Sequence, residues 1–96
     1  MEKENFYKES PLIGVAIATF NRKDYLKECL KNIQLSSYKN FFICVVDDGS
    51  SDGTGFMLES DFPQVEVING DGNLWWGEAS NKAIRSCINA KCEFVI

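Results

Sequence analysis

Two adjacent carboxylates, Asp47 and Asp48, directly follow an apolar run at residues 41–46. A turn rich in Gly, Ser, Asp and Thr comes next, from Gly49 to Thr54. In an open α/β sheet, ligands bind at the carboxyl ends of the strands. Carboxylates can accept hydrogen bonds there, and the free backbone N–H groups of such a turn can hold an anion. The pattern therefore predicts a ligand site at the end of this strand.

A second segment, at Thr19, Phe20, Asn21 and Arg22, stands where the first predicted strand meets its helix. That place offers a helix N-terminus and an aromatic ring that can stack on a base. Arg22 and Lys82 are the nearest cations, and each could meet a phosphate or stay in solvent. In the alternative interpretation, Asn21 only caps the helix and Phe20 fills the core.

A third segment is the glycine-containing loop at residues 69–73, which is followed by Trp75 and Trp76. Two neighbouring indoles in a polar loop are costly unless a ligand, a partner or further chain covers them. Asn73 adds a polar side chain to this loop. Trp75 and Trp76 could form a ligand surface or could pack beneath other residues, and the sequence favours neither interpretation.

The elements that must position these segments alternate between strand and helix. A continuous apolar run, as at residues 12–19 and 41–46, is typical of a strand covered on both faces. Apolar residues of the first helix recur at helical spacing: Tyr25, Leu26, Cys29, Leu30 and Ile33. Strands are expected at residues 12–19, 41–46, 65–68 and 92–96, and helices after Asn21, at about 51–60 and at about 77–90. This order predicts a parallel sheet with right-handed crossovers in a three-layer α/β sandwich.

Composition narrows the function classes. With 96 residues, 45% hydrophobic and 25% charged, the chain is expected to form one small globular domain. No apolar run approaches the roughly 20 residues of a membrane-spanning helix, and the polar start lacks the features of a secretion signal. The four cysteines form no CxxC pair and histidine is absent, which disfavours a zinc site or a histidine-based triad.

The distribution of charge is more informative than the net charge of −4. No Lys or Arg occurs between Lys39 and Lys82, a stretch that contains many acids. Nucleic acid would be repelled by this stretch. A phosphorylated small molecule could still bind through backbone N–H groups or a divalent cation, and a solvated acidic face is the alternative.

The three segments together resemble the nucleotide-binding half of family 2 glycosyltransferases of the GT-A fold. The resemblance covers residues 12–96 and is carried by residues 15–22, 45–54 and 72–77 with Asn81. The third motif is similar to bacterial enzymes that build cell-surface polysaccharides, including rhamnosyl transferases. The resemblance implies a Rossmann-like sheet of order 3-2-1-4. It also implies sugar transfer from a UDP, dTDP or GDP sugar to a saccharide acceptor.

The resemblance also implies roles for particular residues. Phe20 would flank the nucleobase, Asp48 would contact the base, and Asp47 would point back and hold the first loop. Thr19, Asn21, Arg22, Gly49, Asn73, Trp75 and Trp76 complete the expected nucleotide-binding set. For Ser51, Asp52 and Thr54, capping of the following helix is the favoured role.

Residues 1–10 read as a polar lead-in, and residues 11–96 as a truncated GT-A domain that ends within its fourth strand. The family's acidic DxD-like metal motif, its catalytic base and its acceptor-binding half would all follow Ile96. No catalytic residue and no metal ligand is therefore assigned. We expect Mn²⁺ or Mg²⁺ in the full-length family member and none on this chain alone. We further expect the fragment to be inactive by itself, to reside in the cytoplasm or at the inner membrane face, and to self-associate through its exposed apolar surfaces.

Three other classes of protein share some of these features. A phosphoacceptor receiver domain also pairs acids at strand ends, but there the pair follows the first strand. A non-catalytic interaction or structural fragment is supported by the abrupt end of the chain. A nucleotidyltransferase of related fold would open with a glycine-rich loop after the first strand, and residues 19–22 contain no glycine.

Overall fold

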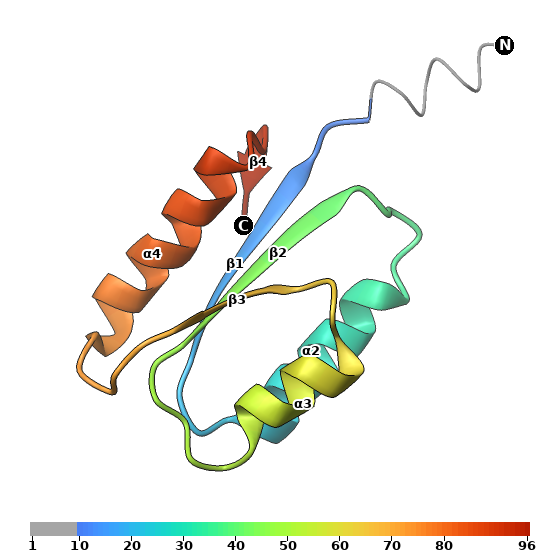
Figure 1. Cartoon of the computed structure of the whole chain (residues 1–96). Coiled ribbons are helices and arrows are strands. Elements are labelled where there is room, and N and C mark those ends of the chain that lie inside the picture. Colours follow the sequence, from blue (N-terminus) through green and yellow to red (C-terminus); the bar gives the residue numbers. More distant parts are fainter. Residues whose placement is uncertain (1–9) are drawn as a thin grey trace, which may run out of the picture.

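A four-stranded parallel sheet forms the centre of the computed structural model, which describes residues 10–96 (Figure 1). The strands are β1 (Ile13–Thr19), β2 (Phe41–Asp47), β3 (Glu66–Asn69) and β4 (Phe94–Val95). Their order is β3-β2-β1-β4, and every pair is parallel. The predicted sheet and its order 3-2-1-4 are confirmed. The expected polar lead-in, apart from Ser10, lies outside the described residues.

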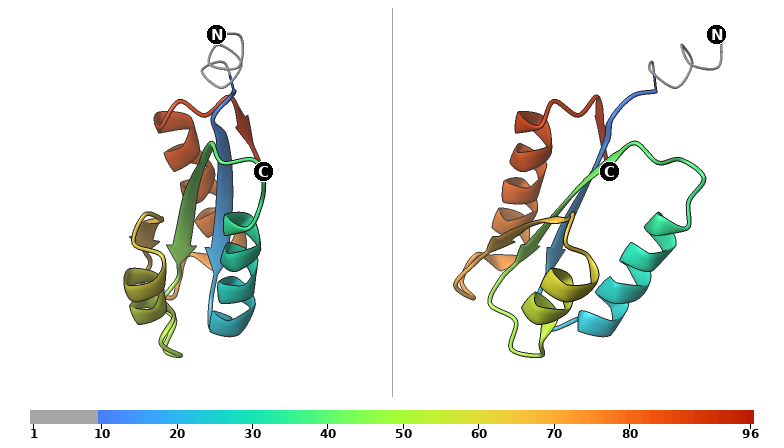
Figure 2. Two further views of the ribbon diagram at one scale, coloured as in Figure 1. Left: turned by 90° about the vertical axis from the view of Figure 1, so that its right-hand side faces the viewer. Right: turned by 45° about the vertical axis from the view of Figure 1, so that its right-hand side comes forward.

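Three helices cover the two faces of this sheet. They are α2 (Lys23–Gln34), α3 (Thr54–Asp61) and α4 (Trp75–Asn89). In the left view of Figure 2, α2 and α3 lie in front of the strands and α4 lies behind them. The α3 helix begins later than predicted because Gly53, with φ of 92°, ends the turn that precedes it. No helix within residues 10–96 has the length and apolar character to cross a bilayer.

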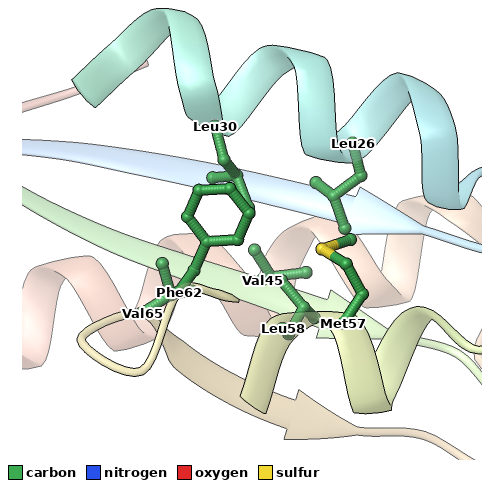
Figure 3. Packing of buried hydrophobic residues seen from close by; sticks show 7 residues of the cluster. All are labelled: Leu26, Leu30, Val45, Met57, Leu58, Phe62 and Val65. Atoms are coloured by element: carbon green, nitrogen blue, oxygen red, sulfur yellow. The ribbon is translucent and has the colours of Figure 1, made fainter. Parts of the chain in front are cut away.

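The core on the α2 and α3 face is made of large aliphatic and aromatic side chains. Figure 3 shows its members packing between the two helices and the sheet: Leu26, Leu30, Val45, Met57, Leu58, Phe62 and Val65. Full burial of one such side chain is worth about 1.5–3 kcal/mol. This cluster therefore fixes α2 and α3, and with them the loops that precede both helices.

The core on the opposite face is built from smaller side chains, which lets α4 lie close to the sheet. Ala79, Ala83 and Cys87 recur every four residues along α4 and are almost fully buried. Cys87 faces Gly14 of β1, where an added Cβ would lie 2.8 Å from the Sγ atom of Cys87. Glycine is thus required here by close approach of the helix.

The continuous apolar run of β2 is explained by these two cores. Val45 belongs to the core under α2 and α3, whereas Cys44 and Val46 belong to the core under α4. All three side chains are 0% exposed. Because successive strand residues point to opposite faces, a strand covered on both sides must be apolar at every position.

The carboxyl end of β1 has a free side. β4 pairs with β1 only at Ile13 and Gly14, and Ile96 exchanges two further backbone hydrogen bonds with the Gly14–Ala16 segment. Within residues 10–96, no strand therefore lies beside Ile17–Thr19 on that side. This free side lies next to the carboxyl ends of β1 and β2, where the predicted site residues are found.

Candidate binding site

Two loops at the carboxyl edge of the sheet are tied together by Asn21. Its backbone N–H donates to Ser50 Oγ at 2.8 Å, and its own Oδ1 accepts from the N–H of Ser51 at 2.8 Å. Asn21 has φ of 51°, a left-handed conformation that asparagine tolerates better than most residues. The alternative interpretation, in which Asn21 only caps α2, is wrong. Arg22 occupies the N-cap position, and its guanidinium has no acceptor for a helix N–H. The Asn21 side chain instead accepts from Ser51 and joins the two loops.

Asp52 connects the beginnings of two helices. Its Oδ2 accepts from the N–H of Lys23 at 3.0 Å, and its Oδ1 accepts from the N–H of Thr54 at 3.2 Å. The Thr54 hydroxyl, which donates to the same Oδ1 at 2.5 Å, and then the Lys23 N–H lower the pKa of Asp52. A negative charge beside helix N-termini is also favoured by the helix dipoles. Asp52 thereby fixes α2 relative to α3.

Asp47 is buried at 5% exposure and closes the turn that follows β2. Its Oδ1 accepts from the N–H of Ser50 at 3.1 Å. Because Ser50 in turn accepts from Asn21, the connection from Asp47 to the first loop runs through Ser50. Gly49, with φ of 81°, supplies the left-handed backbone that this turn needs.

Asp48 is buried at 8% exposure and holds the third loop. Its carboxylate accepts from the backbone N–H groups of Gly72 at 2.8 Å, Leu74 at 3.1 Å and Trp75 at 3.3 Å. Gly70 lies directly against it, since a Cβ there would be 2.5 Å from Asp48 Oδ1. Sequence reasoning missed this contact. The available signal was Gly70, which leaves room for the carboxylate, together with Gly72, whose φ of 93° favours glycine.

A cavity of about 660 Å³ opens beside the free side of β1. Six of the predicted residues line it: Thr19, Phe20, Arg22, Asp48, Trp75 and Trp76. Asn21, Asp47 and Gly49 are not among its lining residues and instead shape the loops. Asn73 is also outside the lining; it is exposed, and its N–H donates to Asp71 Oδ1 at 2.9 Å.

Aromatic rings dominate the mouth of this cavity. Phe20 is 55% exposed, and Trp75 and Trp76 are about four-fifths exposed. Tyr25 also lines the cavity, and the guanidinium of Arg22 stands 5.9 Å from its ring centroid, within cation–π range. Tyr25 and Cys29 belong to the predicted apolar side of α2, yet both are exposed. They line the cavity together with Ile17, Ala18 and Thr19 of β1.

The arrangement suits a ligand that carries a flat ring and an anionic group. Aromatic faces can stack on the ring, Arg22 supplies a positive charge at the rim, and Asp48 lies at the inner wall. Within residues 10–96, no three His, Cys, Asp or Glu side chains are grouped so that they could hold a metal ion. Asp47 and Asp48 already accept backbone N–H groups.

Curated bacterial proteins are similar in sequence to most of this chain. Chondroitin synthase from Escherichia coli is 31% identical over 83 residues, covering 83% of this chain and 12% of that protein. Glycosyltransferase GlyG from Streptococcus pneumoniae is 34% identical over 80 residues, covering 78% of this chain and 26% of that protein. This chain thus spans about a quarter or less of the length of these relatives.

A solved structure shares the fold. It is the mannosyltransferase PcManGT from Pyrobaculum calidifontis, in complex with GDP-Man and Mn²⁺. The TM-score is 0.69 at 22% sequence identity, over 88% of this chain and 30% of that one. The model of the family named glycosyl transferase family 2 matches residues 14–95, most of this chain. The chain belongs to glycosyl transferase family 2.

Proposed function

We propose that this chain is the part of a glycosyltransferase that binds the nucleotide of a nucleotide diphosphate sugar. The whole enzyme would transfer the sugar to a saccharide acceptor. The observation that carries this proposal is the cavity at the carboxyl edge of the sheet, where Phe20, Arg22 and Trp75 face one space. Membership of the family and the GDP-Man bound by the structural neighbour support it.

Each lining residue would contact the part of the nucleotide that suits its side chain. The ring of Phe20 would stack on the base, because an aromatic face accepts any base. Arg22 would meet a phosphate oxygen, for which its planar fork of donors is suited. Asp48 would offer its remaining acceptor capacity to an N–H of the base, as in uracil, thymine or guanine. Trp75 and Trp76 would cover the outer side of the nucleotide, while Thr19 borders it from β1.

The remaining predicted residues would act on the nucleotide through the loops. Asn21, Asp47 and Gly49 determine the loop shapes, and Asn73 would reach the ligand only if the third loop moved. The described residues contain no group of side chains that could hold a metal ion. We infer that the divalent cation, the catalytic base and the acceptor site belong to parts of the enzyme outside residues 1–96. The chain alone would then be inactive. We also propose that the enzyme resides in the cytoplasm or at the inner membrane face.

Titration with UDP, dTDP and GDP, with and without Mn²⁺, tests this proposal by NMR on ¹⁵N-labelled protein. We expect weak binding, with shifts gathered at the amides of Phe20, Arg22 and Trp75. Phe20→Ala should weaken these shifts, whereas Phe56→Ala should not, since Phe56 is a similarly exposed Phe on α3 that does not line the cavity. Shifts centred on α3, or none at any concentration, would refute the site. Sub-micromolar affinity would contradict the expected weak binding.

A second candidate function is self-association. Its support is a group of exposed apolar residues along α4 and β4: Trp76, Ile84, Ile88, Phe94, Val95 and Ile96. Four of them, Trp76, Ile84, Val95 and Ile96, line one hollow, and exposed apolar surface favours contact with another protein surface. Light scattering over a range of concentrations tests it, and a monomer at high concentration would contradict it.

A further inference from the structure

The carboxylate of Asp48 is used mainly inside the protein. Its Oδ1 accepts from Gly72, its Oδ2 accepts from Trp75, and Leu74 donates to both oxygens at 3.3 and 3.1 Å. A carboxylate offers about four lone-pair positions. Three N–H donors therefore occupy most of its capacity before any ligand arrives. At most about one lone-pair position then remains for the N–H of a base, so the carboxylate acts mainly within the protein.

The backbone held by Asp48 has an unusual conformation. Trp75 has φ of 63°, in the left-handed region that bulky residues rarely adopt. Such a conformation persists only where surrounding contacts impose it. The N–H of Trp75 donates to Asp48 Oδ2, so the carboxylate is one of those contacts. Trp75 is also the first residue of α4 and is 80% exposed, so little burial of its own ring holds it in place.

We propose that Asp48 is a positioning residue, which fixes the 70–75 loop and thereby places the Trp75 indole as a wall of the cavity. That Trp75 forms the wall of a nucleotide site rests on the proposed function above. That Asp48 positions the loop does not rest on it, because the positioning concerns the protein without ligand. An amide cannot replace the carboxylate, since it has one acceptor oxygen and its NH₂ group would face an N–H donor.

Gly70 packs against the Asp48 carboxylate and so affects the position of the same loop. An added Cβ would lie 2.5 Å from Asp48 Oδ1 and 2.6 Å from Leu74 Cδ1. Its φ is not in the left-handed region, so alanine is compatible with the backbone there. Gly70→Ala should therefore displace the carboxylate without altering its charge.

Amide exchange with solvent, measured by NMR on the ligand-free chain, tests the proposal. In Asp48→Asn, the amides that lose their acceptor among Gly72, Leu74 and Trp75 should exchange about tenfold faster or more. The near-ultraviolet circular dichroism of tryptophan should weaken at the same time. Gly70→Ala should affect the same amides, which keeps the test valid if Asp48→Asn does not fold.

The matched control is Asp52→Asn, a carboxylate in the neighbouring loop. Asp52 accepts from Lys23 and Thr54 and has no bond to the third loop. Its variant should speed exchange at those two amides and leave residues 72, 74 and 75 unchanged. Unchanged exchange at residues 72–75 in both Asp48→Asn and Gly70→Ala would overturn the proposal. So would an equal increase at the core amides of Val45 and Val46, since that would indicate general destabilisation. Because no nucleotide is present, neither outcome depends on the proposed function.

Discussion

Gly14→Ala should destabilise the protein because α4 lies so close to β1. The new Cβ would be 2.8 Å from both Cβ and Sγ of Cys87 and 2.9 Å from Sγ of Cys92. Ordinary contacts between carbon atoms begin at about 3.5 Å, so the helix would have to move by about 0.7 Å, the difference between 3.5 and 2.8 Å. Cys87 Cβ is fixed to the helix backbone, so a change of rotamer cannot relieve the overlap.

The expected loss follows from the known cost of overpacking. Adding a methyl group to a filled core costs about 1–3 kcal/mol. Replacing glycine also restricts the unfolded chain, which returns about 0.4–1 kcal/mol. With central values of about 2 and about 0.7 kcal/mol, the net loss in the free energy of unfolding should be about 1.3 kcal/mol. For a domain of this size, that lowers the melting temperature by roughly 5–15 °C.

Gly77→Ala is the matched control for Gly14→Ala. Gly77 lies in the first turn of α4, and a Cβ there would have nothing within 4 Å. Alanine favours helix over glycine by up to about 1 kcal/mol, so this variant should be slightly stabilised. Urea denaturation followed by circular dichroism measures both variants. If Gly14→Ala were as stable as the parent, the close approach of α4 would not exist. A loss of similar size in Gly77→Ala would show that α4 tolerates no change at all.

Three further predictions concern pH and the site. Burial raises the pKa of Cys87 to about 11 from 9.0, so stability should be full below pH 9 and fall by about 2–3 kcal/mol as pH rises through 11, in urea titrations. Cys87→Ala should show a smaller fall, because burial also raises the pKa of Cys44. The pKa of Asp52 is lowered, so the protection of the Lys23 amide should be present above the unfolded pKa of 3.8 and be lost on acidification, unlike in Asp52→Asn. Phe20→Leu should weaken binding of UDP by about fivefold or more in NMR titrations with little change in stability, because the ring is 55% exposed; equal affinity would contradict base stacking.

Much of the fold could be predicted because burial pattern and chain order carry the information. The residues at 41–46 are apolar without interruption, which is typical of a strand with helices on both faces, and β2 has that environment. Strand and helix alternate, and right-handed crossovers then leave few arrangements. Helix limits were less certain. At the start of α4, the N–H of Trp75 donates to Asp48, 27 residues away, and the glycines of the third loop do not identify this partner.

The candidate site was harder to predict because its polar side chains use distant backbone groups. Asn21 fits the pattern of a helix cap, but its partners are Ser50 and Ser51, about 30 residues further along the chain. Tyr25 fits the apolar periodicity of α2 and is nevertheless exposed at the cavity. Periodicity indicates which side of a helix is apolar, and it does not indicate where the sheet beneath that side ends.

The bonds between the loops explain why the motif residues are short polar side chains and glycines. Asp52 and Asn21 bind the second loop to the first, and Asp48 binds it to the third, so the three loops form one connected edge. Each of these bonds joins a short side chain to a backbone N–H, which fixes the loop without filling the cavity. Asn21 and Asp52 lie outside the lining of the cavity, whereas Asp48 lines it. The exposed Trp75 is held at its backbone N–H by Asp48 rather than by burial of its own ring.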